Sequence, residues 1–243
     1  MPIKTQPLEY QDGSQTCIGY MAWDDGVTGT QPAVLVNHAW GGLDDFAKDK
    51  ARGLAALGYV GIALDNYGDG DTPETVDDKM ARMNPLVENR EKLRDRLIAG
   101  YDAAATLPIV DETAMAAMGF CFGGLCTLDM ARAGLDLRAA ISFHGLLDAP
   151  DLPTQDIKAE VLVCHGWNDP MSDPADVVKL GEELGKADCN WTLMGFGRTK
   201  HAFMVPDADN DELGLKYNEH AATQAWMATQ DLLSRHFALQ GTR

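Results

Sequence analysis

Hydrophobic and polar positions along the chain follow two periods, one typical of buried strands and one typical of amphipathic helices. Short, mainly apolar runs predict strands that are covered on both faces. These runs occupy residues 33–38, 59–64, 114–118, 139–143 and 160–164. Between them apolar residues recur at helical spacing, for example at Ala47, Ala51 and Leu54 before Gly58. Strands and helices therefore alternate along the chain.

The remaining elements are predicted from turn residues and caps. Residues 3–9 and 16–23 form a hairpin around Asp12-Gly13-Ser14, and residues 190–194 form the last strand. Other helical patterns cover residues 93–107, the stretch after Asp173-Pro174, and a long amphipathic segment at 217–237. Residues 71–92 are highly charged and contain two prolines. They form either a flap over a site or a solvated helix face, and we prefer the second interpretation.

Alternating strands and helices predict an α/β fold, with a mostly parallel central sheet and helices on both faces. We find no internal repeat, low-complexity tract or linker in the sequence. We therefore expect residues 1–243 to form a single domain, a length that provides a sizeable core.

Charge and cysteine content narrow the classes of function. The net charge of −17 argues against nucleic acid or an anionic membrane as partner. No apolar run approaches membrane-spanning length, and the first residues show no export signal. The five cysteines are odd in number and show no Cys-x-x-Cys spacing. A reduced, cytoplasmic location is therefore expected.

The stretch Gly119-Phe120-Cys121-Phe122-Gly123-Gly124 lies between a predicted strand and a helical pattern. It has the form Gly-x-nucleophile-x-Gly, a sharp strand-to-helix turn that exposes the nucleophile. Glycines are needed because side chains at the flanking positions would collide. A helix N-terminus also favours the thiolate of Cys121. The alternative is a glycine-rich turn that contains an ordinary buried cysteine.

A nucleophile of this kind requires an acid and then a histidine later in the chain, each at the end of a strand. Asp169 follows the strand at 160–164, and His201 lies in the loop after the last strand. Because the carboxyl ends of parallel strands share one edge of a sheet, we expect Cys121, Asp169 and His201 to form a catalytic triad. Taken singly, Asp169 fits a turn and His201 fits a solvated loop.

The other histidines have less specific positions. His38 either lines the site or makes a structural hydrogen bond, and His144 is expected in the pocket wall. His165 is expected to support the turn at Asp169, and His220 and His236 to be structural or exposed on the last helix. No group of potential ligands has convincing metal spacing, and no Gly-x-Gly-x-x-Gly opens a helix after the first strand. We expect neither a metal nor a cofactor.

These residues resemble the dienelactone hydrolase family of α/β-hydrolases over nearly the whole chain. The matching segments are residues 43–64, 119–124, 165–170 and 201–203. The resemblance implies an α/β-hydrolase fold that hydrolyses esters or lactones without a cofactor. It assigns the catalytic roles to Cys121, Asp169 and His201.

Two positions depart from that family. Its best-known members carry a glutamate just after the first central strand, where it helps to activate the thiol, and this chain has Ala39. They also carry an arginine four residues after the triad histidine, where it binds the substrate's carboxylate, and this chain has Val205. We therefore expect neutral small substrates to be preferred over dienelactone itself, unless Arg82 or Arg198 reaches the pocket.

The predicted mechanism is two-step acyl transfer with an acyl-cysteine intermediate. The backbone N–H groups of Phe122 and Trp40 are expected to bind the oxyanion. The residues expected to contact substrate are Trp40, Tyr67, Phe122, His144 and Phe203. An acyltransferase or thioesterase with the same triad, or a catalytically silent binding protein, would also fit. The expected partner is a small-molecule ester or lactone, and the chain is expected to be a monomer or homodimer.

Overall fold

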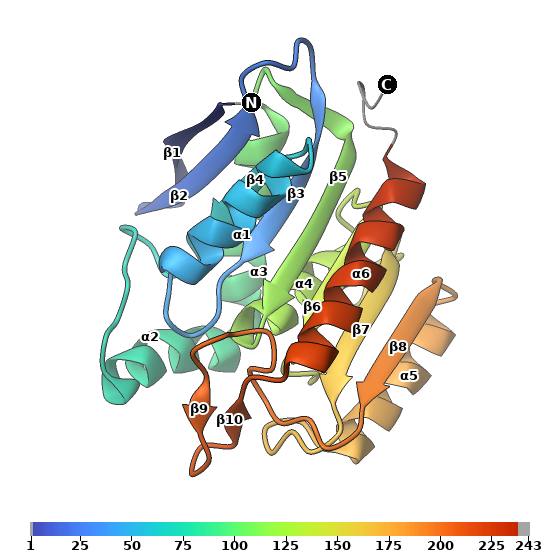
Figure 1. Cartoon of the computed structure of the whole chain (residues 1–243). Coiled ribbons are helices and arrows are strands. Elements are labelled where there is room, and N and C mark those ends of the chain that lie inside the picture. Colours follow the sequence, from blue (N-terminus) through green and yellow to red (C-terminus); the bar gives the residue numbers. More distant parts are fainter. Residues whose placement is uncertain (1, 238–243) are drawn as a thin grey trace.

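The computed structural model describes residues 2–237, which fold around a central eight-stranded sheet that they themselves form (Figure 1). Residue 1 and residues 238–243 of the predicted domain lie outside the described residues. The strands of this sheet are β1 (Ile3–Asp12), β2 (Gln15–Asp24), β3 (Gln31–Asn37), β4 (Val60–Leu64), β5 (Val110–Phe120), β6 (Ala139–Phe143), β7 (Glu160–Gly166) and β8 (Trp191–Phe196). Their order across the sheet is β1-β2-β4-β3-β5-β6-β7-β8. The β1–β2 and β2–β4 pairs are antiparallel, and every other pair is parallel.

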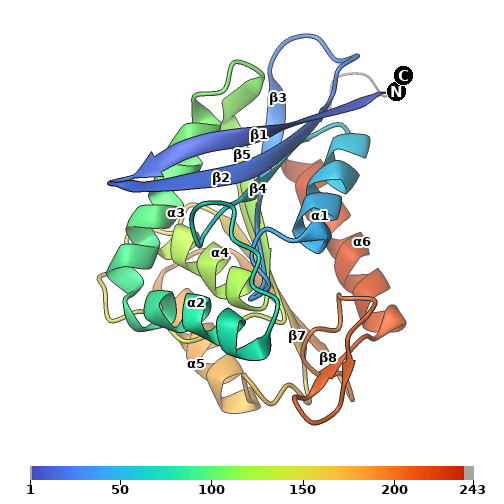
Figure 2. The ribbon, with the colours of Figure 1, turned by 90° about the vertical axis from the view of Figure 1, so that its left-hand side faces the viewer.

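Helices cover both faces of the sheet. They are α1 (Asp45–Ala56), α2 (Val76–Glu88), α3 (Arg90–Ala105), α4 (Phe122–Arg132), α5 (Pro174–Lys186) and α6 (Glu219–His236). Figure 2 shows α1 and α6 on one side of the strands, with α3, α4 and α5 on the other. The prediction of a mostly parallel sheet between two layers of helices is confirmed. None of the described helices is long and apolar enough to cross a membrane.

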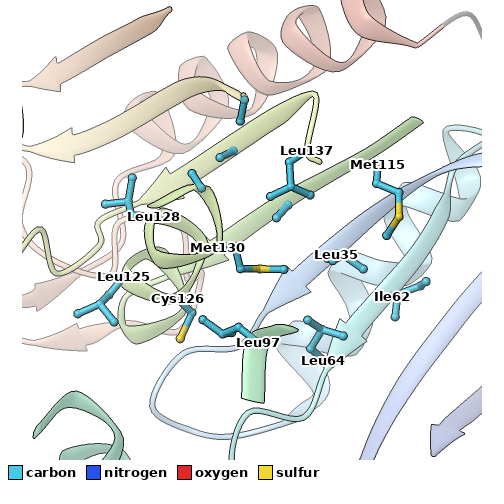
Figure 3. Close-up of a cluster of buried hydrophobic side chains, with 14 of the residues drawn as sticks. Leu35, Ile62, Leu64, Leu97, Met115, Leu125, Cys126, Leu128, Met130 and Leu137 are labelled. Atoms are coloured by element: carbon cyan, nitrogen blue, oxygen red, sulfur yellow. The ribbon is translucent and has the colours of Figure 1, made fainter. Parts of the chain in front are cut away.

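The central strands are buried on both faces, as their continuous apolar runs predict. In β3, Ala33 and Leu35 belong to the core under α3 and α4, while Val34 and Val36 belong to the core under α1 and α6. This division follows from the period of two in a strand. Figure 3 shows the first of these cores, with Leu35 and neighbouring strand residues facing Leu97 of α3 and helix residues of α4.

The topology creates a crevice at the carboxyl ends of β3 and β5. These two strands are neighbours, but the chain leaves β3 for α1 on one face and leaves β5 for α4 on the other. A reversal of this kind is a topological switch point, where the loops separate and ligands bind. Trp40 follows β3 and Cys121 follows β5, so the fold places both at this crevice.

Two regions differ from the sequence prediction. Residues 71–92 contain a separate helix, α2, which starts at the N-cap Thr75 and contains Pro85. A second helix, α3, starts immediately afterwards, because the side chain of Asn89 caps it by accepting from the Lys92 N–H. The loop after β8 also contains a short hairpin, β9 (Asp209–Asn210) with β10 (Leu215–Lys216), which two-residue strands do not reveal in the sequence.

The contact between β4 and α1 generates a test of the packing. A Cβ atom at Gly61 would clash with the backbone of Ala51 in α1, so we expect Gly61→Ala to lower the free energy of unfolding by about 1–3 kcal/mol. Gly53 is exposed in the middle of α1 and has open space around its Cα. Gly53→Ala should therefore raise the free energy of unfolding by about 0.5–1 kcal/mol. Urea denaturation measures both changes. A Gly61→Ala protein as stable as wild type would contradict the close contact between Gly61 and the backbone of Ala51.

Candidate active site

Cys121 occupies the turn between β5 and α4 in a rare backbone conformation. Its φ is 56° and its ψ is −118°. Conformations of this kind cost about 1–3 kcal/mol for a residue with a side chain and persist only where the surroundings impose them. The turn places Cys121 at the N-cap of α4, with a side chain that is 8% exposed at the crevice.

Glycines on both sides of Cys121 permit this turn. A Cβ atom at Gly119 would clash with the carbonyl oxygen of Gly123, and one at Gly123 would clash with that of Asn37. The backbone of β5, the first turn of α4 and the end of β3 therefore approach more closely than side chains allow. The sequence motif is explained by these two close approaches.

Asp169 and His201 meet at the carboxyl end of the sheet. His201 Nδ1 donates to Asp169 Oδ2 at 2.7 Å, and both side chains are almost completely buried. The other carboxylate oxygen of Asp169 accepts from the Met171 N–H at 2.8 Å. The backbone of His201 is bonded to Gly214 and Lys216, so the loop that carries the histidine is held by the β9–β10 hairpin.

Cys121 interacts with the same imidazole. Burial lowers the pKa of His201, but the negative charge of the nearby Cys121 and the hydrogen bond to Asp169 raise it to about 10. Nε2, the nitrogen that does not face Asp169, is buried and has no partner of regular hydrogen-bond geometry within residues 2–237. The ring is thus held by the carboxylate and has one nitrogen available beside the thiol.

A cavity of about 540 Å³ opens at Cys121 and His201. Its walls are mainly apolar, with a few charged and amide side chains among them. They are formed by Ala39, Trp40, Lys79, Met80, Met83, Cys121, His144, Leu146, Met171, His201, Ala202, Val205, Asp207, Ala208, Asp209, Asn210 and Leu215. The volume is suited to a small organic substrate.

The predicted substrate contacts are only partly in this wall. Trp40 and His144 border the cavity, whereas Tyr67, Phe122 and Phe203 do not. The ring of Tyr67 stacks on that of Phe122, with ring centroids 5.8 Å apart. The ring of Phe203 packs edge to face against that of His144, with centroids 5.2 Å apart. These three aromatic residues therefore support the wall from behind, because their rings fill the core next to it.

One face of α2 forms part of the cavity wall, which corrects the preferred interpretation of residues 71–92. Lys79, Met80 and Met83 border the cavity, while Asp77 and Asp78 are exposed to solvent. The two methionines stand three positions apart on one helical face, and this spacing was the signal in the sequence. The segment thus has both a solvated face and a face that covers the site.

The wall from residues 207–215 was not predicted from the sequence. Asp207, Asp209, Asn210 and Leu215 border the cavity because the β9–β10 hairpin folds back beside His201. Neither Arg82 nor Arg198 borders it, and Arg82 instead pairs with Asp71. Ala39 and Val205, the two positions at which this chain departs from the family's best-known members, both lie in the wall.

The predicted oxyanion donors lie at the crevice. Phe122 is the first residue of α4, so its N–H has no intrahelical acceptor. Trp40 borders the cavity, and neither of these two N–H groups has an acceptor in the described part of the chain. Both groups are available for a ligand oxygen.

The other histidines are mostly structural. His38 is buried outside the cavity wall and hydrogen-bonds the backbone. Neither ring nitrogen of His165 has a partner among the described residues, so it makes no hydrogen bond to the Asp169 turn. His220 and His236 are exposed on α6, and His236 pairs with Glu160. Within residues 2–237, no group of three or more His, Cys, Asp or Glu side chains is arranged to hold a metal ion.

Comparisons with known proteins show which family and fold this chain resembles. A model of the dienelactone hydrolase family matches residues 18–237. The crystal structure of a dienelactone hydrolase-like promiscuous phosphotriesterase from metagenomic libraries shares 34% identity, with a TM-score of 0.91 over 98% of this chain and 100% of that chain. A putative carboxymethylenebutenolidase of Synechocystis is 25% identical over 95% of this chain and 96% of that protein. A probable 2-oxo-3-(5-oxofuran-2-ylidene)propanoate lactonase of Bradyrhizobium is 27% identical over 86% of each chain. These similarities confirm the α/β-hydrolase fold.

The cause of the raised pKa of His201 can be tested by substitution of Cys121. Burial alone would lower this pKa, and the negative charge of Cys121 is the strongest effect that raises it. In Cys121→Ala we therefore expect the pKa of His201 to fall from about 10 by about one unit or more. NMR titration of the ring protons measures the change, with Cys189→Ala as a control that should leave the value unaltered. An unchanged His201 pKa in Cys121→Ala would contradict the proposed interaction.

Proposed function

Because the chain belongs to the dienelactone hydrolase family, we propose that it hydrolyses carboxylic esters or lactones through an acyl-cysteine intermediate on Cys121. The observation that carries the proposal is the arrangement around His201. One nitrogen is bonded to Asp169 at 2.7 Å, and the other is unpaired beside Cys121 at the wall of an apolar cavity. The order of Cys121, Asp169 and His201 along the chain and the hydrogen bond from His201 to Asp169 support the roles of nucleophile, orienting carboxylate and base.

In the first step the sulfur of Cys121 forms a bond to the carbonyl carbon of the substrate. The tetrahedral oxyanion is stabilised by the N–H groups of Phe122 and Trp40. As it collapses, the C–O bond breaks and the leaving oxygen takes the proton from His201 Nε2. In a lactone this oxygen remains attached to the acyl chain, because the broken bond belongs to the ring.

In the second step water attacks the thioester. His201 accepts a proton from this water, and the sulfur of Cys121 leaves as the carboxylic acid product forms. Asp169 stays ionised throughout, holding the imidazole in one orientation and stabilising its charged form. No step requires a cofactor.

Activation of the thiol relies on His201, because Ala39 stands where the family's best-known members have a glutamate. The side chain of Ala39 borders the cavity and offers no acceptor for a proton. The raised pKa of His201 suits its imidazole to accept the thiol proton as the sulfur attacks. The position of Cys121 at the N-terminus of α4 stabilises negative charge on the sulfur.

The wall chemistry favours neutral substrates. Val205, at the family's arginine position, offers only apolar contact. Apart from His201, Lys79 is the only cationic side chain of the wall among the described residues, because burial lowers the pKa of His144. The Nζ of Lys79 lies 5.5 Å from the ring centroid of Trp40. Asp207 and Asp209 border the same cavity. Asp209 pairs with Lys216, and Asp207 remains as a negative charge that a substrate carboxylate would meet. An unpaired carboxylate in a partly desolvated site is costly.

Detection of the acyl-enzyme tests the proposed chemistry directly. With a p-nitrophenyl ester we expect a burst of p-nitrophenol followed by slower turnover, and mass spectrometry should locate the acyl group on Cys121. Cys121→Ala should abolish both, and Asp169→Asn should lower the acylation rate by roughly 10²–10⁴-fold. Cys189→Ala is the control and should behave as wild type. If Cys121→Ala hydrolyses the ester at the wild-type rate, the proposal is wrong.

Substrate preference is tested with a carboxylate-bearing lactone and its neutral methyl ester. We expect the wild-type enzyme to have the higher kcat/KM with the methyl ester. Val205→Arg should improve the relative kcat/KM of the acid by roughly 10- to 100-fold, which corresponds to a charge-assisted hydrogen bond of about 1.5–3 kcal/mol. Val205→Leu keeps the wall apolar and should leave the ratio unchanged.

A wild-type preference for the carboxylate-bearing lactone would contradict the proposed specificity. The same panel should include a neutral phosphate triester, because the structural relative with 34% identity is named as a phosphotriesterase.

A further inference from the structure

The loop that follows β3 lies against the first turn of α4. A Cβ atom at Gly123 would clash with the carbonyl oxygens of both Asn37 and His38. Two residues further along, Ala39 and Trp40 border the same cavity as Cys121. The peptide that joins Ala39 to Trp40 is therefore close to the turn that presents the nucleophile.

His38 makes two backbone hydrogen bonds that define its tautomer. Nδ1 lies 2.6 Å from the carbonyl oxygen of Ala39, which can only accept, so Nδ1 carries the proton. Nε2 lies 3.1 Å from the backbone nitrogen of Asn66, which donates to it. Burial lowers the pKa of His38, and a neutral ring is the form that satisfies both bonds at once.

The bond to Ala39 sets the direction of the next N–H group. No cis peptide bond occurs among the described residues, and in a trans peptide the C=O and N–H bonds point in opposite directions. The carbonyl oxygen of Ala39 is held by His38 and also accepts from the Gly42 N–H at 3.2 Å. The N–H of Trp40 must therefore point away from His38, and it has no acceptor in residues 2–237.

Tyr67 holds the following peptide from the loop after β4. Its hydroxyl donates to the carbonyl oxygen of Trp40 at 3.0 Å, and its ring packs against His38 with centroids 4.6 Å apart. The backbone around Tyr67 is itself fixed, because Asp65 accepts its N–H at 3.2 Å and Arg96 donates to its carbonyl oxygen at 3.0 Å. The buried ring of His38 and the half-buried ring of Tyr67 therefore fix two successive peptides of the loop.

We infer that His38 and Tyr67 are positioning residues, which hold the backbone at Ala39 and Trp40 so that the Trp40 N–H faces the carbonyl oxygen of a substrate at Cys121. The inference rests on the proposed acyl transfer, in which this N–H stabilises the oxyanion. A donor that is already oriented stabilises the transition state without reorganisation at the moment of reaction. His38 and Tyr67 thus act through the loop and do not contact the substrate.

The test compares acylation of Cys121 with its alkylation. Acylation by a p-nitrophenyl ester develops an oxyanion, whereas iodoacetamide displaces iodide at a saturated carbon and develops none on a carbonyl oxygen. His38→Leu removes both hydrogen bonds and should lower the acylation rate constant by roughly 10- to 100-fold. This decrease is no larger than the one expected when an oxyanion donor is lost completely. Tyr67→Phe removes only the hydroxyl and should lower it roughly fivefold. Both variants should be alkylated at the wild-type rate.

Two further variants separate positioning from damage to the fold. His38→Asn places an amide near the position of Nδ1, can still donate to Ala39, and should recover most of the acylation that His38→Leu loses. Tyr101→Phe removes an exposed hydroxyl that bonds Asp136, far along the chain from this loop, and should acylate as wild type.

The inference is overturned if His38→Leu and Tyr67→Phe acylate as wild type, or if acylation and alkylation fall in parallel. A wild-type protein that is alkylated at Cys121 but never acylated by any ester overturns the proposed function, and the inference with it. The two failures are therefore distinguishable, because only the second is seen in the unmutated protein.

Discussion

With φ at 56° and ψ at −118°, Cys121 holds a conformation that the rest of the structure must stabilise at a cost of about 1–3 kcal/mol. The close approach of β5, α4 and the end of β3 imposes it, and glycine at positions 119 and 123 makes that approach sterically possible. In this conformation the sulfur of Cys121 projects from the turn at a helix N-terminus and lies beside His201. Packing of three elements thus determines where the nucleophile stands.

Sheet topology and buried electrostatics complete the site around this turn. Asp169 ends β7, His201 follows β8, and the loop after β3 carries Trp40, so separate strand ends converge on one crevice. Burial disfavours a charged His201, yet the negative charge of Cys121 and the carboxylate of Asp169 raise its pKa. His38 and Tyr67, by contrast, are neutral groups that fix backbone direction. The reacting groups thus carry charge, whereas the groups behind them contribute hydrogen-bond geometry.

The sequence was most informative about features that depend on residues close together in the chain. Apolar runs revealed the doubly buried strands, and the glycine spacing revealed the turn at Cys121, because both follow from neighbouring residues. It was least informative where distant segments meet. The packing of Tyr67, Phe122 and Phe203 behind the wall, the cover by Met80 and Met83, and the wall from the β9–β10 hairpin all depend on tertiary contacts. The role of His38 depends on partners in two loops, one of them 28 positions away.

The reactivity of the five cysteines toward iodoacetamide near neutral pH, mapped by mass spectrometry, tests whether Cys121 is the activated nucleophile. We predict that Cys121 is labelled first, because it borders the cavity at a helix N-terminus beside a charged imidazole. Cys164 should be labelled slowly, since it is fully buried and burial raises its pKa to about 12. Equal labelling of Cys121 and Cys164 would contradict the account.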